Sequence, residues 1–342
     1  MTKEETFKVI DSPNKNDWSK FVYNHPHGNI FQAPEMAEVY RRTKNHEPIS
    51  LAVVDEEGEI LALVQAVVIR EMGGFLGSFS ARSIIEGGPL LVKGERGMAA
   101  LKVLMEHYDK IAKKCALYTE IRNLNDMSQF KLLLEKIGYN FEDHLNFLVD
   151  LTKPKEELWS NLSKSRRRFI RKAKEKGVTV EEIKDHNLIP SFYDLLQLTY
   201  KNAKVPLPDI SLFESAFDIL TSKNMLKLFM AKYKDEYIGG IMTLTYKGVI
   251  TEWFVTGSRK HAKLYPSDII SWYPIEWGSE NGYHIFDFLG AGKPDEEYGV
   301  REFKRQFGGS LVNFGRYKKI YVPIKMKIAE KGFKIYRKMF IK

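Results

Sequence analysis

The sequence LKLFMAKYKDEYIGGIMTLTY (residues 226–246) predicts a β-hairpin, because two runs of aliphatic and aromatic residues flank a short polar turn, KDE. An equivalent arrangement lies upstream, where SLAVVDEEGEILALVQAVVI (50–69) places an acidic, Gly-containing turn between two aliphatic runs. Glu59 and Glu236 take matching places before the second run of each hairpin, an offset of 177 residues (236 minus 59). Two copies of one structural unit are therefore predicted.

The segments that follow the two hairpins also correspond. Each half continues with a strand-like run, a polar loop, an amphipathic helix and a last strand: ARSIIEGGPLLV, KGERG, MAALKVLMEHYDKIAKK and ALYTEIRN in the first, and VITEWFVTG, SRKHAKLYPSD, IISWYPIEWGSENG and YHIFDFLG in the second. A chain of 342 residues with 44% hydrophobic residues is long enough for two cores. We predict a mixed α/β (α+β) protein with two tandem subdomains, 1–150 and 151–322, each a mixed sheet flanked by helices, and a tail, 323–342.

This order of elements resembles the GNAT acyltransferase fold, in which the polar loop receives the pyrophosphate of acetyl-coenzyme A. Such a loop is rich in Gly, so that backbone N–H groups at a helix N-terminus can donate to the phosphates. Here SRKHAKLYPSD (258–268) has no internal Gly, and its Pro266 has no N–H to donate. KGERG (93–97) is short. A typical coenzyme A cradle is therefore not expected in either half, and no cofactor is predicted.

Three motifs carry a more specific resemblance. The string W-x-x-L-S-K-S-R-R-R-x-I-R-K-A-x-x-x-G (159–177) is similar to the signature that opens the second half of the Fem-type (FemABX) peptidyltransferases. NIFQAPEMAEVY (29–40) is similar to the family's entry helix, and FDFLGAGKPDEEYGVREFKRQFGG (286–309) to its C-terminal block. The second half has no long coiled-coil insertion, so the chain resembles the branch that lacks this arm.

The resemblance implies a reaction and its partners. Fem-type enzymes are aminoacyl-tRNA-dependent and build peptidoglycan cross-bridges on a tandem acyltransferase fold, in cell-wall biogenesis that maintains cell shape. The expected partners are aminoacyl-tRNA and a muramyl peptide precursor that carries a pyrophosphate, as a nucleotide or on a lipid. Lys304, which follows Phe303, matches the family's Lys beside the reacting carbonyl, and we expect it to be catalytic because a cation in a partly dry cleft stabilises an oxyanion.

The arginines of 159–177 have two readings. They are either a solvated helix face or a clamp for phosphate, which guanidinium groups bind bidentately, on the precursor or on a tRNA acceptor stem. Other positions come from the family's pattern: Thr256 stands where many members have an aromatic residue, Lys204 stands near the place of an Arg, and Tyr298 offers a hydroxyl. The expected substrate-binding residues are Arg166, Arg167, Arg171, Lys204, Trp253, Thr256, Tyr298 and Phe303.

Composition limits the location. A net charge of +9 suggests an anionic partner, and the single cysteine, Cys115, fits a reducing compartment. The longest apolar run is too short to span a bilayer, so cytoplasmic placement is expected. Residues 323–342 mix basic and apolar side chains at helical spacing, which suits either an anionic membrane surface on the inner face or packing on the second domain.

Two other functions stay open. An acyl-coenzyme A-dependent N-acyltransferase acting on a small or lipid-linked amine would use the same fold, and a noncatalytic RNA- or membrane-binding adaptor would retain it without the chemistry. The sequence has no G-x-S-x-G or H-E-x-x-H motif and its histidines are scattered, so neither a serine nucleophile nor a metal site is predicted. The transferred amino acid and the acceptor amine are not determined by these patterns.

Overall fold

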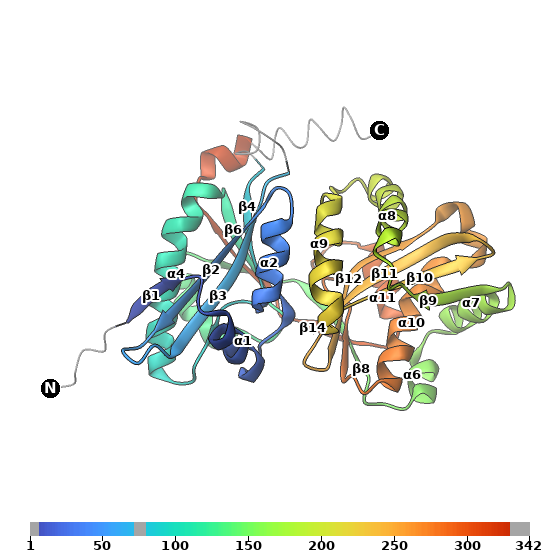
Figure 1. Cartoon of the computed structure of the whole chain (residues 1–342), viewed down its shortest axis with the longest axis horizontal. Coiled ribbons are helices and arrows are strands. Elements are labelled where there is room, and N and C mark those ends of the chain that lie inside the picture. The colour runs from blue at the N-terminus through green and yellow to red at the C-terminus, as the bar shows by residue number, and fades with distance from the viewer. Residues whose placement is uncertain (1–6, 72–79, 329–342) are drawn as a thin grey trace. The chain divides into compact units, whose positions relative to one another are not determined.

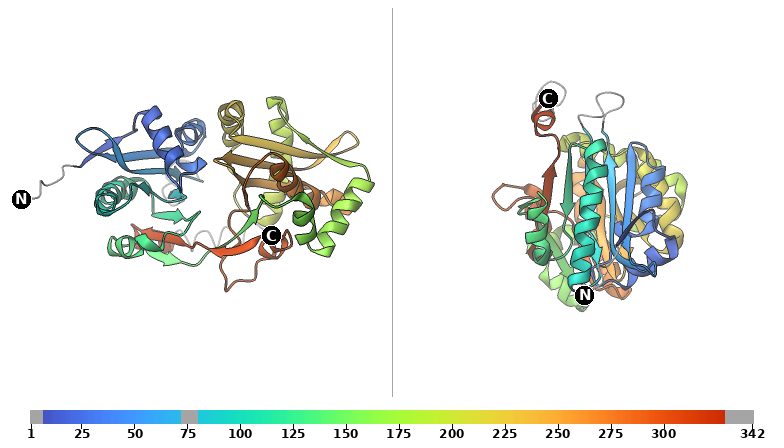
Figure 2. Two further views of the ribbon diagram at one scale, coloured as in Figure 1. Left: turned by 90° about the horizontal axis from the view of Figure 1, so that it is seen from below. Right: turned by 90° about the vertical axis from the view of Figure 1, so that its left-hand side faces the viewer.

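The computed structural model describes residues 7–71 and 80–328 and divides into two compact units, residues 1–142 with 314–342 and residues 143–313. Each unit is a mixed sheet with helices packed on it (Figure 1), and Figure 2 gives two further views. The predicted α/β class and the two tandem subdomains are confirmed. No helix within the described ranges is long and apolar enough to cross a membrane.

The first unit holds a sheet in the order β1-β2-β3-β4-β6-β15-β7, with β5 beside β3. Its strands are β1 (Lys8–Asp11), β2 (His46–Val54), β3 (Ile60–Ile69), β4 (Arg82–Glu86), β5 (Leu90–Leu91), β6 (Tyr118–Arg122), β7 (Asn140–Glu142) and β15 (Arg316–Ile320). Its helices are α1 (Lys15–Asn24), α2 (Pro34–Arg42), α4 (Glu95–Cys115) and α5 (Lys131–Lys136), with 3₁₀ turns η1 (Ile30–Gln32) and η2 (Ser128–Phe130). The hairpin predicted over 50–69 is β2–β3, paired antiparallel.

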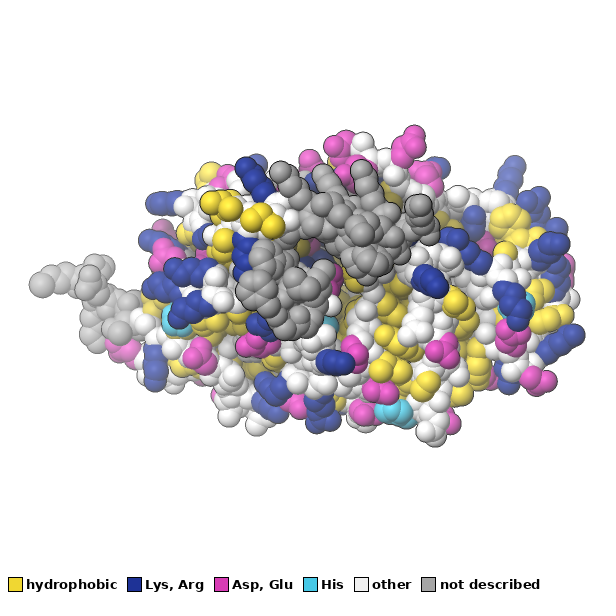
Figure 3. Space-filling view, turned by 90° about the horizontal axis from the view of Figure 1, so that it is seen from above, with side chains coloured by type: hydrophobic (Ala, Val, Ile, Leu, Met, Phe, Trp, Pro, Cys, Tyr) yellow, Lys and Arg dark blue, Asp and Glu magenta, His cyan; other side chains and the backbone are white. Residues whose placement is uncertain are grey.

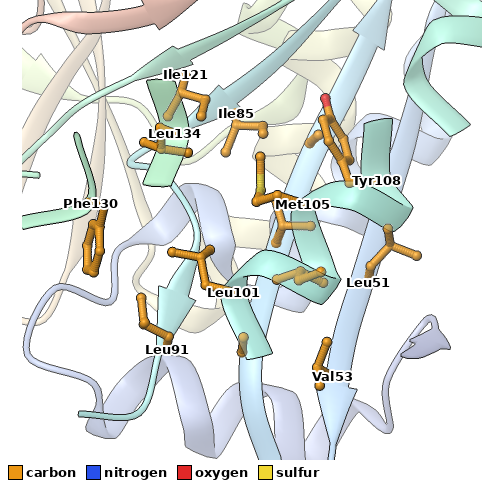
Figure 4. Packing of buried hydrophobic residues seen from close by; sticks show 14 of the residues in the cluster. Leu51, Val53, Ile85, Leu91, Leu101, Met105, Tyr108, Ile121, Phe130 and Leu134 are labelled. Carbon is orange, nitrogen blue, oxygen red and sulfur yellow. The ribbon is translucent and has the colours of Figure 1, made fainter. Parts of the chain in front are cut away.

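The core of the first unit lies between its sheet and α4. Leu101 and Met105 recur at a spacing of four on α4 and face the strands, as an amphipathic helix requires. They pack on Val53 of β2, Ile85 of β4 and Ile121 of β6, all of which are fully buried (Figure 4). The parallel pair β4–β6 is joined by α4, the crossover that a parallel connection needs.

The second unit holds a sheet in the order β14-β8-β13-β12-β11-β10-β9. Its strands are β8 (Leu145–Asp150), β9 (Val178–Glu182), β10 (Leu226–Tyr233), β11 (Glu236–Tyr246), β12 (Val249–Gly257), β13 (Ile285–Asp287) and β14 (Ser310–Asn313). Its helices are α6 (Lys155–Asn161), α7 (Lys164–Glu175), α8 (Ile189–Ala203), α9 (Ile210–Leu220), α10 (Pro266–Glu280) and α11 (Gly299–Arg305), with 3₁₀ turns η3 (His186–Leu188), η4 (Thr221–Lys223) and η5 (Arg259–Leu264). The hairpin of 226–246 is β10–β11, and the segment of the 159–177 motif contains the end of the short helix α6 and all of the longer α7.

Two adjacent glycines on β11 let helices approach both faces of the second sheet. Successive strand residues point to opposite faces. A Cβ on Gly239 would lie 3.3 Å from the ring of Pro266 in α10, and a Cβ on Gly240 would lie 2.7 Å from the ring of Phe192 in α8. The Gly-Gly pair in YIGGIM therefore sets how closely α8 and α10 pack.

The boundaries between the units differ from the predicted ones. We expected the first subdomain to end at residue 150 and the second at 322, but β8 pairs with β13 and β14 in the second sheet, and β15 pairs with β6 and β7 in the first. The chain thus enters the second unit after residue 142 and returns to the first after 313. Hydrogen-bond partners distant in sequence decide this, and strand patterns do not encode them. Of the tail predicted over 323–342, residues 323–328 are helical and the rest lies outside the described residues.

Candidate functional site

A cavity opens in the second unit where two parallel strands separate. β12 and β13 are paired from Val249–Ile285 to Thr251–Asp287. Immediately beyond, a β-bulge interrupts the pairing of β12 with β11, and Trp253 is left without a partner opposite it. A bulge bends its strand and re-aims the neighbouring side chains. The space beyond, about 540 Å³, is lined by residues 252–257 and 288–290 together with side chains of α8, α10 and α11.

The structure places Lys304 in the wall of this cavity. Its side chain is buried, and the Nζ donates to the main-chain oxygens of Phe288, Leu289 (2.9 Å) and Gly290 (3.3 Å). Oε1 of Glu252 lies 3.1 Å from the same nitrogen. An ammonium has three N–H groups, so these four acceptors use its full donor capacity. Lys304 therefore ties α11 to the turn after β13 and to the bulged strand.

Glu252 is a residue of this site that the motifs did not indicate. Of the described residues lining the cavity, it is the one carboxylic acid. Burial raises the pKa of Glu252, and the attraction of Lys304 opposes that rise without cancelling it. A carboxylate with a raised pKa is a better proton acceptor than an exposed one. The signal available in the sequence was a lone acid inside an apolar strand, VITEWFVTG.

Asp287 is a second buried acid close to this site. The Oδ1 of Asp287, the last residue of β13, accepts hydrogen bonds from Asn146 Nδ2 and from the backbone N–H of Leu289, both at 2.7 Å. Burial raises the pKa of Asp287, and these hydrogen bonds oppose the rise. Asp287 thus holds the turn whose carbonyl groups accept from Lys304.

Aromatic side chains form much of the cavity lining. Trp253 and Phe254 come from the bulged strand, Tyr200 from α8, and Phe288 and Phe303 from the segments beside Lys304. Burial raises the pKa of Tyr200 to about 12, so its hydroxyl stays protonated at neutral pH. Flat apolar walls of this kind suit a planar ring or an aliphatic acyl group.

Three of the predicted substrate-binding residues thus line the cavity: Trp253, Thr256 and Phe303. The Thr256 hydroxyl is already engaged, because its Oγ1 lies 2.7 Å from Oγ1 of Thr199 and 2.9 Å from the main-chain oxygen of Leu195, which accepts its proton. Thr256 therefore joins β12 to α8. The cavity rim also carries the exposed guanidinium of Arg259, which the motifs did not single out.

The arginines of α7 make internal contacts. Arg166 pairs with the buried Asp268 of α10, donates from Nε to Gln306 Oε1 at 3.0 Å, and lies 4.7 Å from the ring centroid of Phe303. Its guanidinium therefore fastens α7 to α10 and to the segment that carries Lys304. Because a carboxylate and an amide oxygen already occupy it, the expected phosphate contact of Arg166 is not supported.

The other two arginines predicted to bind substrate, Arg167 and Arg171, contact α6. Arg167 donates to the main-chain oxygens of Ser160 and Leu162 (2.9 Å for the latter), carbonyl groups at the C-terminal end of that helix. Arg171 lies 5.5 Å from the ring centroid of Trp159. Neither residue lines the cavity, and both make contacts that hold α6 and α7 together. Their role as a phosphate clamp stays a prediction.

The last two predicted residues also lie outside the cavity lining. Lys204 takes a left-handed conformation (φ 57°) at the C-terminal cap of α8. Tyr298 is exposed and packs over Gly292 at the start of α11. Loop conformation decides both positions, and the sequence pattern alone does not specify it.

The N-terminus of α10 offers a poor phosphate cradle. Pro266 occupies its first turn, and the backbone N–H groups of Asp268 and Ile269 donate to the oxygen of Tyr265 at 3.2 and 3.3 Å. The carboxylate of Asp268 sits in the same turn, where a helix N-terminus attracts negative charge. Two of the amides at the start of α10 are therefore already used, and Pro266 supplies none.

The strands of the first unit separate in a corresponding way, because β5 continues along β3 beyond the last pair of β4 with β6. β4 and β6 stay paired to Glu86–Arg122, and these two side chains form an ion pair at 3.3 Å. A cavity of about 760 Å³ lies beside the start of α4, lined in part by His25 and His27. The described residues contain no cluster of His, Cys, Asp or Glu that could hold a metal ion. Of these two cavities, the one in the second unit is lined by a buried Lys–Glu pair.

Comparison with known proteins agrees with this architecture. Residues 160–305 match the family described as Acetyltransferase (GNAT) domain. A comparison with curated protein sequences gives no match.

Solved structures extend the likeness to both units. The crystal structure of FemX is 17% identical and covers 94% of this chain and 100% of its own, with a TM-score of 0.70. The L-PGS of Bacillus licheniformis is 14% identical, with coverage of 93% and 96% and a TM-score of 0.58. A tandem GNAT protein from the clavulanic acid biosynthesis pathway is 8% identical, with coverage of 92% and 99% and a TM-score of 0.59. The chain therefore has the tandem GNAT fold of acyltransferases, in the arrangement also found in FemX, as its motifs predicted.

Proposed function

We propose that this protein is an aminoacyltransferase that moves an amino acid from aminoacyl-tRNA to an amine of a peptidoglycan-type precursor, forming an interpeptide bridge. The observation that carries the proposal is the cavity of the second unit. There Nζ of Lys304, on α11, lies 3.1 Å from Oε1 of Glu252, on the bulged strand β12. The fold shared with FemX supports the same reaction class.

The residues of the cavity suit acyl transfer to an amine. The amine nitrogen attacks the ester carbonyl carbon, a C–N bond forms, and the C–O bond to the ribose breaks. The nitrogen must lose a proton and the ribose oxygen must gain one. Glu252 is the acceptor for the amine proton, because it is the carboxylate within the cavity and its pKa is raised by burial.

Lys304 is the cation that would stabilise the negative charge that develops on the carbonyl oxygen during the attack. Its longest contact, 3.3 Å to the oxygen of Gly290, is the one that an oxyanion would replace. A preorganised cation in a site of low dielectric stabilises such charge more strongly than one in water. The partly exposed indole of Trp253 in the cavity wall would stack on the terminal base of the RNA, a contact that tolerates any sequence.

The phosphate partner is assigned to Arg259 rather than to the arginines of α7. Arg259 is exposed at the rim of the cavity, whereas Arg166 and Arg167 are occupied by protein oxygens. A tRNA donor places the reaction in the cytoplasm, and a precursor carrying pyrophosphate, on a nucleotide or a lipid, is the acceptor that we propose.

The test is incubation of the pure protein with charged total tRNA and candidate cell-wall precursors, followed by mass analysis of the acceptor. The expected result is an acceptor heavier by one amino-acid residue, formed only with charged tRNA. The K304M protein, refolded or purified in the same way, is the control. Transfer to none of the precursors, with intact charged tRNA recovered, would contradict the proposal.

A second candidate is an acyl-coenzyme A-dependent N-acyltransferase, which the family match over residues 160–305 favours. The occupied amides at the start of α10 argue against it. Calorimetric titration separates the two functions: measurable heat with acetyl-coenzyme A and none with charged tRNA would favour the second candidate. A solved structure with a similar fold, the C-terminal domain of a putative lysylphosphatidylglycerol synthetase from Agrobacterium fabrum (14% identical, TM-score 0.57), suggests a lipid as an alternative acceptor, so phosphatidylglycerol belongs in the same assay.

A further inference from the structure

Exposed aliphatic side chains gather at the end of the described chain in the first unit. We call Ile320, Val322, Ile324 and Ile328 the C-terminal patch. All four are exposed, and Ile324 and Ile328 retain 78% and 55% of their surface in contact with solvent. Ile324 and Ile328 are four residues apart in a helical segment and so lie on one face of it. Solvent-exposed apolar groups that cluster in this way mark an interaction surface.

The extended part of this patch, Ile320 and Val322, is anchored to the unit through its backbone and Tyr321. The backbone N–H groups of Tyr321 and Val322 donate to the oxygen of Leu117, at 2.9 and 3.4 Å. The Tyr321 hydroxyl donates to Asp109 at 2.7 Å in the core. The side chain of Tyr321 therefore points inward, whereas its neighbours Ile320 and Val322 point outward. The aliphatic side chains therefore face solvent because the backbone is anchored with the alternation of an extended segment.

Positive charge surrounds the patch. Lys113 and Lys114 are exposed in the last turn of α4, directly before Leu117, and Lys327 is exposed within the helical segment itself. Lys318 lies on β15 over the ring of Tyr118, 4.6 Å from its centroid. Figure 1 shows the helical segment beside the end of α4, and Figure 3 views this side, with hydrophobic side chains at the surface of the first unit and Lys and Arg side chains nearby.

Two carboxylates of the same elements are already paired with other cations. Asp109 of α4 is paired with Lys319. Glu120 of β6 is paired with Arg122 at 2.7 Å and with Arg316 at 3.0 Å. Glu106 is the other acid in the second half of α4, where Lys110, Lys113 and Lys114 outnumber it, so the rim of the patch keeps a positive charge.

We propose that the C-terminal patch binds the surface of an anionic lipid bilayer. Aliphatic side chains enter the headgroup region, and lysines beside them attract anionic lipids. A purely apolar partner would not require the lysines, and a polyanion such as RNA would not require the isoleucines. This inference does not depend on the proposed reaction.

Vesicle sedimentation of the full chain tests the proposal. Phosphatidylcholine vesicles are compared with vesicles that also contain phosphatidylglycerol. We expect binding to the anionic vesicles, weakened by added salt, and a loss of at least about tenfold in the partition coefficient of the variant I324D/I328D. The matched control is L132D/L198D, which makes the same change of charge at leucines that are 83% and 60% exposed elsewhere.

Each other outcome overturns the proposal. Equal binding by I324D/I328D and the control would remove the patch from the membrane contact. Equal binding to both kinds of vesicle, insensitive to salt, would remove the role of the lysines. A dimer in gel filtration that I324D/I328D dissociates would assign the patch to a second copy of the chain. Transfer to a water-soluble precursor, measured on the same variant, should be unchanged, so failure of the membrane proposal and failure of the proposed reaction are distinguishable.

Discussion

Replacing Lys304 by Met tests the buried ion pair on which the proposed mechanism depends. Met keeps the length and apolar character of the side chain and removes the charge. Glu252, 3.1 Å away and 6% exposed, then loses its partner. Removal of one partner of a buried pair costs about 3–5 kcal/mol because an uncompensated charge remains. The double variant K304M/E252Q should recover a large part of this loss, since neither charge is left.

The dependence on pH gives a second signature with a definite sign. Burial raises the pKa of Glu252 and Lys304 opposes the rise, so the substitution raises that pKa further. An acid whose pKa is higher in the folded state binds a proton more readily there, and its contribution to stability falls as pH increases from the unfolded pKa to the folded pKa. The stability deficit of K304M relative to the natural protein should therefore be larger at about pH 8 than at about pH 5.

Urea unfolding followed by tryptophan fluorescence measures both effects. The chain has five tryptophans, and the four in the second unit are Trp159, Trp253, Trp272 and Trp277. The signal thus reports mainly the unit that carries the substitution. Equal urea midpoints for K304M and the natural protein at both pH values would refute the Lys304–Glu252 pair. A double variant no more stable than K304M would refute it as well.

Three further variants separate structural roles from binding roles. R166A should destabilise the second unit by about 3–5 kcal/mol in urea unfolding, because Asp268 is left buried and unpaired; a change below about 0.5 kcal/mol, typical of surface positions, would contradict this. D109N should destabilise the first unit by about 2–4 kcal/mol, since the carboxylate accepts from two tyrosines and pairs with a lysine; an unchanged thermal midpoint would rule out that network. R167A/R171A should lower stability by about 1–2 kcal/mol and leave precursor affinity, measured by calorimetry, unchanged; a tenfold weaker affinity would return these arginines to the binding site.

Local patterns in the sequence were sufficient for the elements and their duplication. The hairpins over 50–69 and 226–246, the crossover helices and the short helix before α7 all follow from residues that are neighbours along the chain. Periods of two and about 3.6 residues are properties of single strands and helices, so they can be read without knowledge of the partner. The motif around Lys304 also marked a segment that the structure places in the cavity wall.

Contacts between distant residues decided the rest. Arg166 and Asp268 are 102 positions apart, and no local pattern tells a solvated arginine from one that is buried against a carboxylate. The bulge at Trp253 and the pairing of Glu252 with Lys304 arise only when β12, β13 and α11 are assembled. By itself the sequence determined two tandem α/β units and the segment that carries the ammonium group. Only the tertiary structure decided which charges neutralise each other and where a cavity remains, because burial and electrostatic pairing depend on distances in space.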